Sequence, residues 1–108
     1  MRSTLGFGTA LLLLALGGTL ARADVKGKDI TFKSGDEEVK GFLAEPEGKG
    51  PHQGIVVIQE WWGLTDWIKD NARRLAEHGY VCLAPDLYHG KVANDPMMAR
   101  QLMMGLPK

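Results

Sequence analysis

The sequence has 108 residues with 13 basic and 13 acidic side chains, so its formal charge is zero at neutral pH. This balance argues against the strongly basic surfaces that bind nucleic acid or anionic membranes, and we expect neither as a partner. Cys82 is the only cysteine, which excludes an internal disulfide.

Residues 1–23 have the three parts of a secretory signal peptide. Arg2 supplies a positive charge, residues 10–16 form a short apolar run, and residues 21–23 read Ala-Arg-Ala, a small-x-small cleavage motif. The apolar run is shorter than the roughly 20 residues needed to span a bilayer, which disfavours the alternative of a retained anchor. We therefore expect an exported protein, periplasmic or secreted, that begins at Asp24 and keeps no stable membrane anchor.

The next part of the chain has the pattern of a β-hairpin. Asp29–Lys33 alternates polar and apolar residues, the period of a half-buried strand, and Val39–Ala44 is a second short strand candidate. Ser34–Asp36 is a turn cluster between them. A loop rich in proline and glycine, residues 45–51, then leads to Ile55–Ile58. This run of four β-branched residues predicts a strand buried on both faces, as in a parallel sheet covered by helices.

Helical spacing follows over Asp66–His78. Thr65 or Asp66 can cap the start of this helix, and Gly79 occupies the position of a helix C′ residue. Tyr80–Ala84 is the next apolar strand. The order strand, helix, strand predicts a βαβ unit with parallel strands and a right-handed crossover.

A last helix is expected over roughly Pro96–Met104, a segment rich in methionine. Together the elements predict the α/β class, with an antiparallel hairpin followed by a βαβ unit of a mostly parallel sheet. Such sheets place their binding sites just beyond the carboxyl ends of the strands. That rule draws attention to residues 59–63 and 86–90, which follow the two strands of the βαβ unit.

Glu60 is the candidate functional residue in the first of these segments. It follows four aliphatic residues and Gln59 at the strand end and precedes Trp61 and Trp62. We expect the aromatic rings to desolvate its carboxylate partly, to raise its proton affinity and to suit it to acid–base chemistry. The alternative is a solvated carboxylate at the start of a loop. Trp61 and Trp62 point in different directions if the chain is extended, so one would belong to the core and the other to a pocket wall.

Three blocks of the sequence resemble the dienelactone hydrolase family. Residues 55–64 (IVVIQEWWGL) resemble the family's segment after its third strand, residues 73–80 (RRLAEHGY) its helix end, and residues 84–90 (APDLYHG) the strand-end signature that follows. The resemblance covers about Gly41 to Gly105. It implies the N-terminal part of an α/β-hydrolase fold.

The resemblance also implies roles for individual residues. The glutamate of the family's Gln-Glu pair contacts the nucleophile and takes part in its activation, and Glu60 stands at that position. The backbone N–H of Trp61 would form half of the oxyanion hole, and Trp62 would line the acyl or lactone pocket. Arg100 lies near the place of a family arginine that binds the substrate carboxylate. The implied substrate is a small ester or lactone, and no cofactor or metal is implied.

The family's catalytic nucleophile has no counterpart among the 108 residues. Family members carry a cysteine or serine in a Gly-x-Cys/Ser-x-Gly elbow, followed by an aspartate and a histidine, and the sequence contains no such elbow. Cys82 lies inside an apolar strand and is expected to be a buried core residue. His52, His78 and His89 lack metal-ligand spacing, although His89 lies near a strand mouth where it could touch a ligand.

Two functions follow from these observations. The first is a carboxylic-ester or lactone hydrolase whose Cys (or Ser)-Asp-His triad lies beyond residue 108, so that the 108 residues alone would be inactive. The second is a non-catalytic exported module that binds a small molecule or a protein through the loop of Trp61 and Trp62. The oligomeric state stays open.

Overall fold

The N-terminal hairpin is longer than its alternating pattern predicts. In the computed structural model, which describes residues 25–107, strand β1 spans Lys26–Ser34 and strand β2 spans Glu37–Glu45. The two strands pair antiparallel along their whole length. Gly35 has a φ of +61° at the first position of the two-residue turn, a conformation that glycine adopts without strain.

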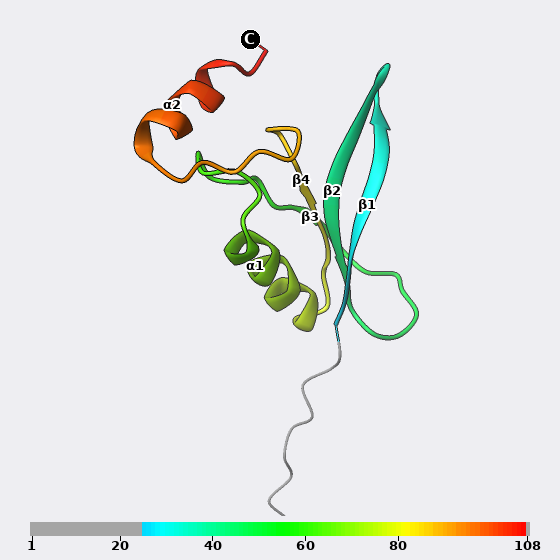
Figure 1. Ribbon diagram of the computed structural model, residues 1–108. Helices are drawn as coiled ribbons and strands as arrows, with labels where there is room; N and C mark the ends of the chain where they lie inside the picture. The colour runs from blue at the N-terminus through cyan, green and yellow to red at the C-terminus, as the bar shows by residue number, and fades with distance from the viewer. Residues whose placement is uncertain (1–24, 108) are drawn as a thin grey trace, which may run out of the picture.

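The predicted βαβ unit is present. Strand β3 (Gly54–Val56) leads through helix α1 (Asp66–Glu77) to strand β4 (Val81–Pro85), and β3 and β4 pair parallel. Strand β4 also pairs antiparallel with β2, so the sheet is mixed and has the order β1-β2-β4-β3 (Figure 1). The α/β class is therefore confirmed.

Helix α1 covers one face of the sheet through small side chains. Its buried residues are Ile68, Ala72 and Ala76, and they pack with four buried residues of β2 and β4: Phe42, Ala44, Cys82 and Ala84. Alanine and cysteine let the helix backbone lie close to the sheet, so even one added methylene is expected to strain this interface.

Both helices begin and end close to the predicted positions. The N-cap of α1 is Thr65, whose side chain makes no capping hydrogen bond, and Gly79 follows the helix with a φ of +96°. Helix α2 spans Pro96–Met104, as the sequence predicted, and the Asp95 side chain accepts a hydrogen bond from the Met98 N–H at 2.9 Å. Such a cap satisfies one of the free N–H groups of the first turn.

The run Ile55–Ile58 is not buried on both faces, so that expectation was wrong. Ile55 and Val57 pack against the core, whereas Val56 and Ile58 are 58% and 62% exposed. Successive strand residues point to opposite faces, and the face of Val56 and Ile58 is the one that α1 does not cover.

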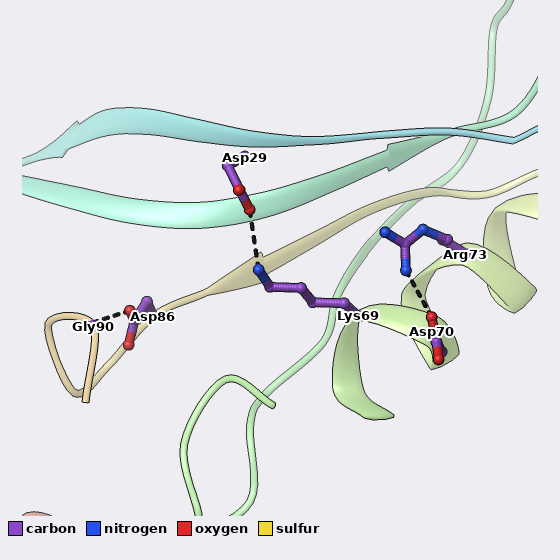
Figure 2. A network of polar contacts seen from close by, with 6 residues as sticks. All are labelled: Asp29, Lys69, Asp70, Arg73, Asp86 and Gly90. Carbon is purple, nitrogen blue, oxygen red and sulfur yellow. Dashed lines mark hydrogen bonds and ion pairs between the residues drawn. The ribbon is translucent and has the colours of Figure 1, made fainter. Parts of the chain in front are cut away.

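One ion pair joins the hairpin to α1, and a second lies within the helix. The Lys69 ammonium lies 3.1 Å from the Asp29 carboxylate of β1, and the Arg73 guanidinium lies 2.6 Å from Asp70 on the same helix. Figure 2 shows both pairs. The Arg73 guanidinium also lies over the ring of the buried Phe42, 4.6 Å from its centroid. The carboxylates of both ion pairs are largely exposed, so each pair contributes about 1 kcal/mol at most, and burial of the Phe42 ring stabilises the fold more than either pair.

No helix within residues 25–107 is long and apolar enough to cross a bilayer. The signal peptide expected at residues 1–23 lies outside the described residues and stays a prediction.

Replacement of Ile68 by alanine should destabilise the fold strongly. Ile68 is 3% exposed in the core, so Ile68→Ala removes buried methylenes and leaves a cavity, which should lower the free energy of unfolding by about 2–5 kcal/mol. Trp67→Ala is the matched control, because Trp67 is the adjacent helical residue and is 60% exposed. Urea denaturation followed by circular dichroism measures both variants. If both variants lost the same small amount of unfolding free energy, the packing of α1 on the sheet would be contradicted.

Candidate active site

The carboxyl ends of β3 and β4 bring together a first loop, residues 59–63, and a second loop, residues 86–93, which contains the predicted segment 86–90. The Val57 N–H donates to the Leu83 carbonyl at 2.8 Å and so continues the parallel pairing up to the first loop. Beyond it, the Ala93 N–H donates to the Trp62 carbonyl at 2.8 Å. The two loops therefore form one hydrogen-bonded unit at the edge where α/β sheets bind ligands.

The side chain of Gln59 joins the two loops where they leave the sheet. It is 9% exposed, and its Oε1 accepts a hydrogen bond from the Leu87 N–H at 3.0 Å. Sequence reasoning did not single out Gln59, although a polar residue that directly follows a buried apolar run needs an internal partner. Gln59 thus holds the backbone that carries Glu60 and Trp61.

A sharp turn at Gly63 ends the first loop. The Gly63 N–H donates to the Glu60 carbonyl at 3.1 Å, and Gly63 has a φ of +109°. A Cβ atom at this position would lie 2.7 Å from the Lys91 carbonyl oxygen. Any other residue would push the second loop away, so the close approach of the two loops depends on glycine.

Asp86 organises the second loop. Its buried carboxylate accepts hydrogen bonds from the N–H of Tyr88 at 3.0 Å and from the N–H of Gly90 at 2.7 Å, the second of which is drawn in Figure 2. Its own N–H donates to the Lys40 carbonyl of β2 at 2.8 Å. Both carboxylate oxygens are engaged with the backbone, so Asp86 supports the turn rather than acid–base chemistry. The turn leaves His89 exposed, with a φ of +50°.

A cavity of about 260 Å³ opens beside the first loop, and Glu60 and Trp61 both line it. The Glu60 side chain is exposed, so the flanking rings do not desolvate it within the described part of the chain, contrary to expectation. The remaining walls come from the segment that follows β3, the second loop and the α2 region: Ile58, Gln59, Leu87, Tyr88, Met103 and Leu106. No sequence pattern indicated Met103 or Leu106, because only the tertiary fold brings them to this loop.

The two tryptophans do not divide into a core residue and a pocket residue as expected, because their rings contact each other and neither belongs to the buried core. Their rings meet edge to face, with centroids 5.1 Å apart and an interplanar angle of 62°. Trp61 is 41% exposed and lines the cavity, whereas Trp62 is half-buried and is not among the residues that line it. Within residues 25–107 the backbone N–H of Trp61 donates no hydrogen bond, so it is available to an incoming oxygen.

Arg100 and Cys82 lie away from this cavity. Arg100 is exposed on α2 and does not contribute to the cavity wall. Cys82 is fully buried in the core, as predicted. Burial raises the pKa of the Cys82 thiol above its ordinary value, so the reactive thiolate is disfavoured there.

This chain has the mixed sheet, the crossing helix and the two strand-end loops of the α/β-hydrolase fold. Solved relatives share this fold over 75% or more of the chain. Within that fold, the model of the dienelactone hydrolase family matches residues 39–108. The chain belongs to the dienelactone hydrolase family.

Individual relatives agree with this assignment. Protein usf of Aquifex pyrophilus is 41% identical over 80 residues, which cover 71% of this chain and 34% of that protein. The solved structure called m3DLH is 36% identical with a TM-score of 0.66, over 75% of this chain and 35% of its own. P91, a dienelactone hydrolase-like promiscuous phosphotriesterase from metagenomic libraries, is 32% identical with a TM-score of 0.65. The match covers 75% of this chain and 34% of P91. The chain therefore spans about a third of the length of these relatives.

Removal of the Gln59 amide should loosen both loops. Gln59→Leu leaves the Leu87 N–H without its acceptor, which should lower the free energy of unfolding by about 1–3 kcal/mol. Gln53→Leu is the matched control, since Gln53 is exposed and only its backbone carbonyl is hydrogen-bonded. Urea denaturation gives the stability, and hydrogen exchange of the Leu87 amide gives the local effect. If that amide stays as protected in Gln59→Leu as in the wild type, the bridge does not hold the loops.

Proposed function

We propose that this chain contributes to a hydrolase that cleaves carboxylic esters or lactones, with the loop of Glu60 and Trp61 in its active site. The supporting observation is that Glu60 and Trp61 follow β3 and line the same cavity, and that the Trp61 N–H donates no hydrogen bond within residues 25–107. One group can accept a proton and the other can donate a hydrogen bond to an oxyanion. Membership of the dienelactone hydrolase family agrees with this chemistry.

In the proposed reaction, a cysteine or serine outside these 108 residues attacks the carbonyl carbon of the substrate. Glu60 assists removal of the proton from that nucleophile, and the Trp61 N–H stabilises the negative charge that develops on the carbonyl oxygen. The histidine of the triad receives that proton and donates it to the leaving alcohol, and water then hydrolyses the acyl-enzyme, which releases the acid and restores the proton of the nucleophile.

Two further side chains have proposed substrate-binding roles. Trp62 packs edge to face on Trp61 and would line the acyl or lactone pocket of the whole hydrolase. Arg100 does not line the cavity beside Glu60, so it would bind a carboxylate that the substrate carries outside that cavity, reached by its exposed guanidinium from α2.

The codons that follow Lys108 test the proposal directly. No Gly-x-Cys/Ser-x-Gly elbow occurs in the 108 residues, so on their own they are proposed to be inactive. An open frame that encodes an elbow, then an aspartate and a histidine, is the expected result. A stop codon directly after Lys108 would contradict the hydrolase. It would favour a non-catalytic module, for which the exposed Trp61 ring on a largely apolar cavity is the supporting observation.

Glu60→Gln should lower turnover far more than it changes folding. In the protein translated from the complete reading frame, loss of the carboxylate should reduce kcat/KM for p-nitrophenyl acetate by about 10²–10⁴-fold, the usual contribution of a general base. The free energy of unfolding should change by less than about 0.5 kcal/mol, because the side chain is exposed. Glu47→Gln, at another exposed loop glutamate, is the control. Unchanged kinetics in Glu60→Gln would remove Glu60 from the mechanism.

A further inference from the structure

We propose that the cavity beside Glu60 accepts a short, uncharged hydrocarbon chain of the substrate, and that Met103 is a residue that determines this specificity. The inference rests on the proposed function and adds the chemical class of the substrate. It follows from the lining of the cavity, its charge and its size.

The walls opposite Glu60 are apolar and converge from separate parts of the chain. Ile58 comes from the segment that follows β3, Leu87 from the second loop, and Met103 and Leu106 from the α2 region. Ile58 is 62% exposed and Met103 is 46% exposed, so both present apolar surface to the open cavity. A hydrocarbon chain that covers this surface removes it from water, which favours binding.

The charges around the cavity favour a neutral ligand. Among residues 25–107, Glu60 is its only acidic lining residue, and the lining contains no lysine, arginine or histidine. His89 and Lys91 instead line an adjoining cavity of about 310 Å³, on the other side of a shared wall that includes Tyr88 and Leu106. A carboxylate in the cavity beside Glu60 would therefore lie near Glu60 with no cation among the lining residues that this part of the chain supplies, and like charges in such a position repel.

The size of the cavity favours a short chain. Its volume of about 260 Å³ lies below the roughly 300–1,000 Å³ of sites that enclose drug-sized ligands. Met103 is unbranched and flexible, so its thioether can adjust to the end of the bound chain. Its replacement by alanine would remove much of the apolar wall that α2 supplies.

Methyl NMR of the 108-residue chain labelled at its methionines tests the inference without any catalysis. The probes are 1-hexanol and hexanoate, which have the same chain length and differ in charge at neutral pH. We expect 1-hexanol to shift the ε-methyl signal of Met103, and hexanoate to bind at least about 10-fold more weakly because it meets Glu60. The ε-methyl of Met104 is the internal reference, since Met104 is 68% exposed and does not line the cavity.

Substitutions complete the test. Met103→Ala should weaken 1-hexanol binding, and Met104→Ala on the same helix should leave it unchanged. Leu106→Ala, on the same wall, should also weaken binding and replaces Met103→Ala if that variant does not fold. Hexanoate binding as tightly as 1-hexanol, or equal shifts at Met103 and Met104, would overturn the inference.

Kinetics of the protein from the complete reading frame separate the inference from the proposed function. p-Nitrophenyl butyrate should have a higher kcat/KM than the mono-p-nitrophenyl ester of succinate, and Met103→Ala should reduce the difference. Hydrolysis with preference for the charged ester overturns the inference and leaves the hydrolase standing. Selective binding of 1-hexanol without hydrolysis of any ester overturns the proposed function alone.

Discussion

The parallel pairing of β3 with β4 is the constraint on which the candidate site depends. Parallel strands end at the same edge of a sheet, so their following loops must meet there. In this chain the meeting is fixed by Gln59, whose buried amide accepts from the Leu87 N–H, and by the glycine at position 63, which lets the second loop come close. Glu60 and Trp61 have a defined place because their neighbours in sequence are held on both sides.

Much of the fold could be predicted from local patterns. The helix of Pro96–Met104 has the predicted bounds, and α1 begins at the predicted Asp66 and ends one residue earlier than expected. These segments carry their own signals, since amphipathic spacing, capping residues and a terminal glycine all act within a few residues. The burial of Val56 and Ile58 was predicted wrongly because it depends on a second covering layer, which no local pattern specifies.

The candidate site could be predicted only in part. The sequence predicted which two loops follow the strands of the βαβ unit, because the ends of strands can be recognised from apolar runs. It also indicated Glu60 as the residue in these loops suited to acid–base chemistry. The partners of those residues could not be predicted. The wall of Met103 and Leu106 depends on how α2 packs after a turn that Asp86 organises through two backbone hydrogen bonds. The exposure of Glu60 likewise depends on the tertiary placement of the tryptophan rings, which pack on each other edge to face.

The two edge strands of the sheet differ in charge, so one edge is better suited than the other to pair with an additional strand. Strand β1 carries three lysines, Lys26, Lys28 and Lys33, along one edge, and positive charge of this kind discourages pairing with another strand. Strand β3, at the opposite edge, is short, apolar and free of charge. An additional strand would therefore join beside β3, on the side where the loop of Glu60 and Trp61 emerges. A strand added there would extend the sheet at the edge that carries the candidate site.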